Sequence, residues 1–268
     1  MGDTEVHGAV RDLVKSFRVA EIFGPTIQGE GRRIGTPCHF IRFGGCDYRC
    51  VWCDSPHAVL PELVAQLPQK TEKDIWREVR QLSSKALWVV YSGGNPALLD
   101  LSLLTAYLIG DGYSVMVETQ GTVWRDWLGY VDEVCVSPKP PSSQNPTRHD
   151  VLKDFLAHFS SRHDNAVYLK VVVFDDEDYY YAQWVHKTFP QFELFLSVGN
   201  EDPFLPTVSN PEGKVENRIN PFPLSKTRSE VLDKMVWLME KLANDQSMRR
   251  VRVLPQMHVL SWGNARGR

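Results

Sequence analysis

GGCDYRCVWCDSPH, residues 44–57, holds three of the five cysteines of this 268-residue chain. Cys46, Cys50 and Cys53 follow a C-x3-C-x2-C spacing. Three thiols are one more than a disulfide uses and one fewer than a closed four-cysteine metal site needs. A 4Fe–4S cube normally takes one thiolate per iron, so three cysteines on one loop would leave one iron open to a reactant. A zinc site completed by His57 and a chance grouping of core cysteines are the alternatives that the spacing leaves open.

The overall composition is that of an ordinary soluble globular protein, with 43% apolar and 24% charged residues. The net charge of −3 gives no sign of a nucleic-acid partner or of an anionic membrane surface. We find no apolar run of about 18 residues and no signal-peptide core, so neither a membrane span nor secretion is expected. The expected location is cytoplasmic, where clustered cysteines bind metal more often than they form disulfides.

Short apolar runs alternate with segments of helical periodicity along the chain. Strands are expected at 18–23, 39–44, 86–93, 113–119, 133–138, 167–174, 192–198 and 250–255. Helices are expected after the N-cap residue Thr71, over 98–108 and 176–189, and along the apolar stripes that begin at Val151 and Val231. This order predicts one α/β domain over 1–268 with a parallel sheet or barrel, in which 1–17 is an N-terminal extension and 201–223 a loop insertion.

Polar or glycine-rich stretches follow five of the expected strands. They read GGCDYRC, SGGNP, ETQGT, SPKPP and SVGN in chain order. Because the carboxyl ends of parallel strands share one rim, we expect these stretches to form a common binding site. Cys38 and Cys135 lie inside strand-like runs instead, so they are expected to be small buried residues that bind no metal.

Six stretches together resemble the 7-carboxy-7-deazaguanine synthases of the radical S-adenosylmethionine superfamily. They are FGPTIQGEG, FIRFGGCDYRCVWCDS, SGGNPAL, ETQGTV, SPKPPSS and RVLPQMHVLSWGNARG. The resemblance runs from about residue 18 to the C-terminus, except for 201–223. It implies a modified, incomplete TIM-like barrel, usually a homodimer, that converts 6-carboxy-5,6,7,8-tetrahydropterin to 7-carboxy-7-deazaguanine and ammonia on the route to queuosine.

The resemblance also implies three cofactors: a 4Fe–4S cluster, S-adenosylmethionine and Mg²⁺. In such enzymes the open iron chelates S-adenosylmethionine, and an electron from the cluster yields a 5′-deoxyadenosyl radical that removes hydrogen from the pterin. The electron comes from a donor such as flavodoxin or ferredoxin. A different radical enzyme, such as a glycyl-radical activase, and a non-catalytic zinc or iron–sulfur binding module are the competing functions.

The resemblance assigns site residues position by position. The cluster ligands are Cys46, Cys50 and Cys53, and the Mg²⁺ ligand is Ser55. The S-adenosylmethionine contacts are Trp52, Cys53, Asp54, Gly94, Ser137, Pro138, Lys139, Ser197, Val198, Gly199 and Asn200. The substrate contacts are Ile27, Gln28, Gly29, Arg42 and Ser92, and Glu118 and His258 are the catalytic candidates.

Several of these positions have a plainer explanation. Ser55 could be a helix cap, and SGGNP could be an ordinary turn. Arg42 could form a structural salt bridge instead of binding a substrate carboxylate. Asn95 stands where the related GGE motif has Glu, which keeps a backbone role but puts a carboxylate role in doubt. The basic tail WGNARGR is longer than the one whose C-terminal carboxylate contacts substrate in one branch of the family, so that role is not carried over.

Overall fold

The computed structural model describes residues 15–82, 86–159, 166–200, 224–263 and 265–267. The expected insertion at 201–223 and residues 1–14 of the expected extension lie outside the described residues. The first strand begins at Ser16, so the last residues of that extension belong to the sheet. No helix in the described ranges has the length and apolar character needed to cross a membrane.

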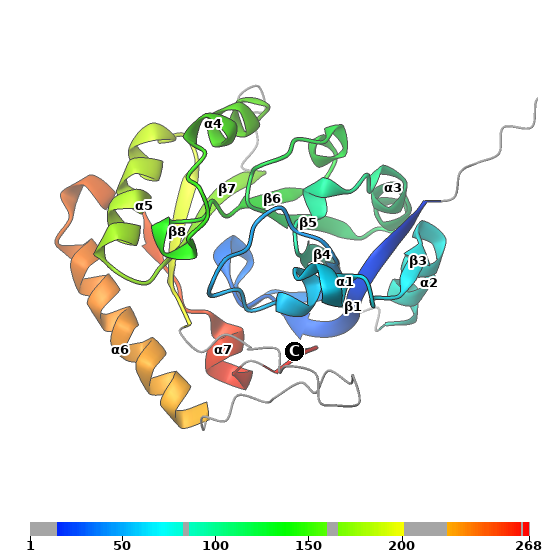
Figure 1. The fold of residues 1–268 in the computed structure, drawn as a ribbon, viewed down its shortest axis with the longest axis horizontal. Helices are drawn as coiled ribbons and strands as arrows, with labels where there is room; N and C mark the ends of the chain where they lie inside the picture. The colour runs from blue at the N-terminus through cyan, green and yellow to red at the C-terminus, as the bar shows by residue number, and fades with distance from the viewer. Residues whose placement is uncertain (1–14, 83–85, 160–165, 201–223, 264, 268) are drawn as a thin grey trace, which may run out of the picture.

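One sheet organises the described part of the chain (Figure 1). Its strands are β1 (Ser16–Ile27), β2 (Pro37–Phe43), β3 (Gln69–Thr71), β4 (Trp88–Gly93), β5 (Ser114–Thr119), β6 (Glu133–Val136), β7 (Val167–Val173), β8 (Glu193–Val198) and β9 (Arg252–Val253). Their order in space is β3-β1-β2-β4-β5-β6-β7-β8-β9. From β2 to β9 neighbouring strands are parallel, whereas β1 runs antiparallel to both β2 and β3.

The helices lie mainly around the outside of the curved sheet (Figure 1). They are α1 (Pro61–Val64), α2 (Glu72–Gln81), α3 (Ser102–Gly110), α4 (His149–Ala157), α5 (Asp176–Thr188), α6 (Leu224–Ala243) and α7 (Met257–Trp262). In the described residues β3 and β9 are the two edges of the sheet, so the barrel is incomplete, as expected. All eight expected strands are present, and Thr71 caps α2 by accepting a hydrogen bond from the Asp74 amide (3.2 Å). Three elements were not expected, because each is only a few residues long: β3, α1 and α7.

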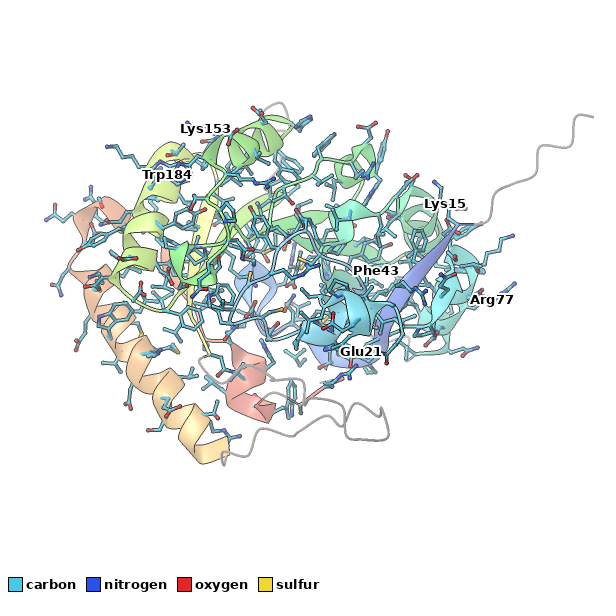
Figure 2. All side chains as sticks on the ribbon, in the orientation of Figure 1. Lys15, Glu21, Phe43, Arg77, Lys153 and Trp184 are labelled. Atoms are coloured by element: carbon cyan, nitrogen blue, oxygen red, sulfur yellow. The ribbon has the colours of Figure 1, made fainter. Side chains whose placement is uncertain are left out.

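Side chains that alternate along the strands form two separate apolar layers. Val89 and Tyr91 of β4 pack in the large core between the sheet and the helices, together with Phe43 of β2 (Figure 2). Val90 points to the opposite face, into a small inner cluster that also contains the buried Cys38 and Cys135. The period-2 geometry of a strand therefore decides which residues can reach the inside of the partial barrel.

Candidate active site

A pocket opens above the inner apolar cluster, at the carboxyl ends of the parallel strands. On four strands an inner apolar residue is followed, two positions later, by a polar residue that lines the pocket. The pairs are Phe40 and Arg42 on β2, Val90 and Ser92 on β4, Met116 and Glu118 on β5, and Tyr168 and Lys170 on β7. The alternation of the strands thus places a polar layer directly above an apolar floor.

The three cysteines of the loop after β2 all line this pocket. Two of the sulfurs accept N–H hydrogen bonds: Cys46 Sγ lies 3.4 Å from both Gln120 Nε2 and the Tyr48 amide, and Cys50 Sγ lies 3.2 Å from Asn145 Nδ2. Such N–H···S bonds are typical of thiolates that hold iron–sulfur clusters. This donor set therefore fits a cluster.

A single metal ion fits these cysteines less well. Among the residues that the structure describes, no group of three histidine, cysteine or acidic side chains converges on one ion. His57, the fourth ligand of the alternative zinc site, instead has its Nε2 3.6 Å from Glu21 Oε2. Zinc needs all its ligands within about 2.3 Å of one point, whereas a cube spreads them over separate irons, so the geometry favours the cluster.

Burial affects the protonation of the cysteines. It raises the pKa of Cys53 to about 12, with the neighbouring Asp54 carboxylate adding to the effect, and it also raises the pKa of Cys50. Without metal these two thiols are therefore neutral near pH 7. Because iron binds the thiolate, loading the site releases protons.

Two glycines let the cluster loop approach the end of β4. A Cβ on Gly94 would lie 1.9 Å from the carbonyl oxygen of Gly45, and Gly93 has a positive φ of 117°. The amide of Asn95 donates to that same Gly45 oxygen (2.7 Å). SGGNP was expected to let a ligand approach the backbone; in the structure the close approach is to the cluster loop itself.

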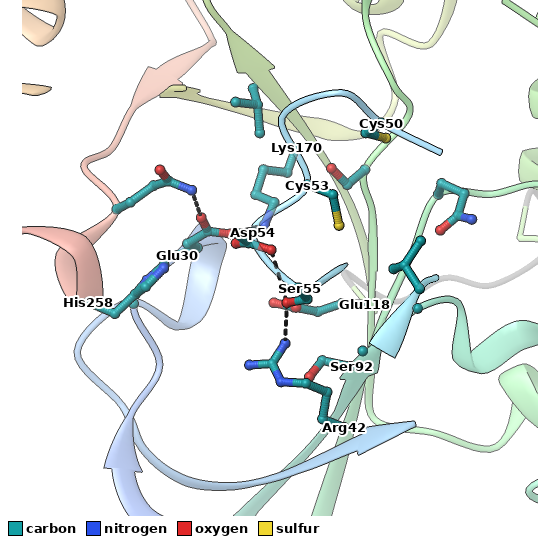
Figure 3. Close-up of a pocket in the computed structure, with 18 of the residues that line it drawn as sticks. Glu30, Arg42, Cys50, Cys53, Asp54, Ser55, Ser92, Glu118, Lys170 and His258 are labelled. Atoms are coloured by element: carbon teal, nitrogen blue, oxygen red, sulfur yellow. Dashed lines mark hydrogen bonds and ion pairs between the residues drawn. The ribbon is translucent and has the colours of Figure 1, made fainter. Parts of the chain in front are cut away.

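Arg42, Ser55 and Asp54 form a chain of hydrogen bonds in the pocket (Figure 3). Arg42 Nη1 donates to Ser55 Oγ (2.9 Å), and Ser55 Oγ donates to Asp54 Oδ1 (3.0 Å). Although Ser55 occupies the N-cap position of a short 3-10 helix, its side chain makes no capping bond. The hydrogen bond that a helix cap would make is therefore absent, and capping does not explain why a serine stands at position 55.

Arg42 also forms a salt bridge with Glu21, at 2.9 Å from its Nε. Glu21 accepts a second charged contact from Arg266 Nε (2.8 Å), near the C-terminus. Burial raises the pKa of Glu21, but the nearby His57 ring and the charges of Arg42 and Arg266 outweigh this and lower the pKa to about 2. The structural salt bridge weighed for Arg42 is thus present, and the Arg42 side chain lines the pocket as well.

A second charged group lies across the pocket, where Lys170 of β7 forms a salt bridge with Glu30 (Figure 3). Gln256 Nε2 donates to the other oxygen of Glu30. Burial raises the pKa of Glu30, but the adjacent ammonium of Lys170 outweighs this and lowers the pKa to about 2. Burial lowers the pKa of Lys170, and the Glu30 carboxylate more than reverses that effect. Both groups are therefore charged at neutral pH.

The catalytic candidates lie beside this pair. Gln28 Nε2 donates to Glu118 Oε1 (3.2 Å), and the orientation of that amide is fixed because Gln28 Oε1 accepts from the Glu30 amide (3.2 Å). His258 belongs to α7. This helix packs against the loop after β1, which contains Gln28 and Glu30, through a hydrogen bond from the Met257 amide to the Gly29 carbonyl (2.9 Å). A Cβ on Gly29 would lie 2.4 Å from His258 Nδ1, so only glycine permits this contact.

Most of the expected site residues meet in this one pocket. Those that line it are Ile27, Gln28, Gly29, Arg42, Cys46, Cys50, Trp52, Cys53, Asp54, Ser55, Ser92, Gly94, Glu118, Ser137, Lys139, Asn200 and His258. Four of the S-adenosylmethionine candidates are not in the lining: Pro138, Ser197, Val198 and Gly199. The Val198 side chain packs in the outer core instead, and Gly199 lies against the ring of Phe174.

Several residues that line the pocket were not singled out from the sequence, among them Lys170, Gln256 and Gln120. Lys170 carried a usable signal, because a lysine inside the apolar run VYLKVVVF needs a partner when it is buried. Gln120 lies in ETQGT and Gln256 in RVLPQMHVLSWGNARG, but nothing in those stretches marks the glutamine as the residue that faces the pocket.

Comparison with known proteins gives the following relatives. The chain is 41% identical over 251 residues to a 7-carboxy-7-deazaguanine synthase of Bacillus cereus, covering 93% of this chain and 98% of that one. It is 38% identical over 258 residues to a 7-carboxy-7-deazaguanine synthase of Bacillus subtilis, covering 95% and 100%. Among solved structures, QueE from Escherichia coli matches with a TM-score of 0.55 and 22% identity over 91% of this chain and 95% of that one, which supports the fold. No family model matches the chain.

Proposed function

Because the chain belongs to the 7-carboxy-7-deazaguanine synthase family, we propose how its pocket carries out that reaction. The chain is a radical S-adenosylmethionine enzyme that converts 6-carboxy-5,6,7,8-tetrahydropterin to 7-carboxy-7-deazaguanine, and the competing functions are not favoured. The observation that carries the proposal is the meeting of the three cysteines with Gln28, Arg42 and other polar side chains in one pocket.

The cysteines would hold the cluster, and the open face of the pocket would hold S-adenosylmethionine. When bound, these groups would supply radical chemistry through a 5′-deoxyadenosyl radical. Trp52 is fixed for a cofactor contact, since its Nε1 donates to Ser142 Oγ (3.0 Å) and its ring packs on Phe174 at 5.1 Å. Lys139 lies 5.9 Å from the centre of the Trp52 ring and adds a positive charge on this side. These contacts support the assignment of Trp52 and Lys139 to the cofactor.

The substrate would bind between the cluster loop and the Glu30–Lys170 pair. Gln28 and Glu118 are oriented by their mutual hydrogen bond, and Glu30 is held ionised by Lys170. Buried acceptors among these groups suit the N–H groups of a pterin ring. Gln256 Oε1 is one such acceptor, because it is buried and has no hydrogen-bond partner in the described residues. We therefore add Glu30 and Gln256 to the proposed substrate contacts, beside Glu118 and His258.

Mg²⁺ would bind at Ser55 Oγ. Mg²⁺ prefers oxygen ligands and often takes only one or two from the protein, keeping water and substrate oxygens for the rest. Ser55 fits this chemistry because its hydroxyl makes no cap and lies in the pocket 3.0 Å from a carboxylate oxygen of Asp54. The ion would help orient an anionic substrate.

The test is an anaerobic assay of the loaded enzyme with and without Mg²⁺. Wild type is expected to form 7-carboxy-7-deazaguanine, to release ammonia and to leave S-adenosylmethionine unconsumed. Ser55→Ala should stay brown and lose the stimulation by Mg²⁺, whereas Ser55→Thr, which keeps the hydroxyl, should retain most of it. Full stimulation of Ser55→Ala would show that Ser55 is not the ligand. Absence of product from brown wild type would contradict the substrate.

Arg42 is proposed to hold the substrate carboxylate with the part of its guanidinium that faces the pocket. Because Glu21 and Ser55 already take two of its nitrogens, the substrate gains one charged hydrogen bond. Such a bond contributes about 1.5–3 kcal/mol. Arg42→Met should therefore raise the KM about 10- to 100-fold while the protein keeps its cluster.

The matched control for this variant is Arg266→Gln. It removes another partner of Glu21 without touching a residue of the pocket lining. It is expected to leave the KM unchanged. If Arg42→Met and Arg266→Gln lower the Tm by similar amounts and neither changes the KM, the role of Arg42 is structural.

Two partners and a location are also proposed. A reductant such as flavodoxin or ferredoxin would supply the electron, because the radical reaction needs one from outside the chain. A second copy of the chain would complete a homodimer, which an apolar face of α6 supports: Leu232, Val236 and Met239 are exposed there at helical spacing. A reducing, cytoplasmic setting suits the five free cysteines.

A further inference from the structure

Three loops meet at the carboxylate of Asp47, the residue directly after the first cluster cysteine. Asp47 Oδ1 accepts hydrogen bonds from Gln120 Nε2 (2.6 Å) and from Asn95 Nδ2 (2.9 Å). Asn95 follows β4 and Gln120 follows β5, so these bonds tie the cluster loop to the ends of two parallel strands. The Asn95 side chain has no role in the functions assigned above, and Gln120 appears there only as an N–H donor beside Cys46.

The orientation of the Asn95 amide is fixed by its surroundings. Asn95 is 1% exposed, and its Oδ1 accepts from Thr119 Oγ1 (2.8 Å) and from the Ala97 amide (3.2 Å). Its Nδ2 must then point to Asp47. A flipped amide would place an oxygen against the Asp47 carboxylate, and a glutamate at this position would place a second negative charge there. Asn95 and Asp47 are therefore suited to each other in this chain.

Gln120 connects this arrangement to a cluster ligand. Its Nε2 has two hydrogens and two acceptors in reach: Asp47 Oδ1 at 2.6 Å and Cys46 Sγ at 3.4 Å. Gln120 is 6% exposed, so water competes little for the amide. The carboxylate that binds one hydrogen thereby helps to aim the other at the sulfur.

We propose that Gln120, held by Asp47 and Asn95, is a positioning residue that donates an N–H to Cys46 and raises the reduction potential of the cluster. The inference rests on the proposed function, since it requires the cluster. An N–H···S bond stabilises the more negative, reduced state more than the oxidised one, and hydrogen bonds to cluster sulfurs are a known determinant of potential. The negative charge of Asp47 acts in the opposite direction and lowers the potential.

The test is a redox titration of the loaded protein, followed by electron paramagnetic resonance. Gln120→Leu keeps the approximate size and removes the N–H. It should hold about four irons per chain. At the midpoint potential of wild type, its ratio of reduced to oxidised cluster should fall about five- to tenfold, equivalent to roughly 40–59 mV for one electron.

Asp47→Asn is the matched variant, with an effect of opposite sign. The new amide keeps an oxygen that can accept from Gln120 and Asn95, but it removes the negative charge beside Cys46. The proportion of reduced cluster should therefore rise. A loop that is merely loosened would lose iron in both variants and would not shift the potential in opposite directions.

The outcomes decide the matter as follows. A fully loaded Gln120→Leu with the potential of wild type overturns the proposal. If Gln120→Leu cannot be loaded, Gln120→Met, which also lacks the N–H, takes its place, and an unchanged potential in that variant overturns the proposal. Colourless, iron-free wild type would count against the cluster and hence against the proposed function as well, which separates the two failures.

Discussion

Alanine in place of Cys46, Cys50 or Cys53 is expected to abolish the visible absorption of the reconstituted protein and all product formation. Each of these thiols lines the pocket at its own position on the loop, so neither of the other two can take its place. A three-cysteine loop also has no spare ligand. The measurement is iron content and absorption after anaerobic reconstitution, followed by the assay.

Cys38→Ala and Cys135→Ala are the controls. Both residues are buried in the inner apolar cluster, at 1% and 0% exposure, and neither lines the pocket. They should keep the cluster and lose only a small amount of stability, as is usual when a small buried side chain is trimmed. If Cys38→Ala bleaches the protein and Cys46→Ala does not, the ligand assignment is wrong.

The cluster loop and the strand ends could be predicted from the sequence because their signals are local. The spacing of the cysteines, the apolar runs and the glycines of SGGNP each lie within a few consecutive residues. Since parallel strands end on the same rim, the local signals also predicted that SGGNP and ETQGT would lie together, and Ser92 and Glu118 of these stretches line one pocket. Arg42 was assigned to the site by the resemblance instead.

What could not be predicted are the contacts between distant parts of the chain. Glu30 and Lys170 are 140 positions apart, and Glu21 and Arg266 are 245 apart. No residue pattern encodes which carboxylate will meet which cation, since that depends on the register of the sheet and on where α7 docks. The partner of Arg42 is therefore known only from the fold.

Lys170→Met is expected to cause the largest loss of stability of any single substitution in the pocket that keeps the cysteines. It leaves the Glu30 carboxylate buried without its cation, and removing one partner of a buried pair typically costs about 3–5 kcal/mol. A decrease of about 10 °C in Tm follows for a domain of this size. The control is Lys15→Met, whose salt bridge with Asp100 joins two exposed side chains and should contribute at most about 1 kcal/mol.

The pH dependence of this variant should differ in sign from that of wild type. In wild type the pKa of Glu30 is about 2, below its usual 4.5, so Glu30 contributes stability that is present above about pH 4.5 and lost as the pH falls toward 2. Without Lys170, burial should raise the pKa of Glu30 above 4.5. The variant should therefore lose stability as the pH rises through that raised pKa.

The double variant Glu30→Gln/Lys170→Met distinguishes two causes of the lost stability: the Glu30 charge left without a partner, and the lost packing of the Lys170 side chain. It removes both charges and keeps the amide oxygen for Gln256, so it should recover most of the stability lost in Lys170→Met and abolish the altered pH dependence. A double variant as unstable as the single one would mean that the lysine stem, packed in the inner wall of the pocket, is what matters. A fully stable Lys170→Met would mean instead that Glu30 is readily neutralised or hydrated in the pocket, and that its ionised state cannot be part of how the substrate is held.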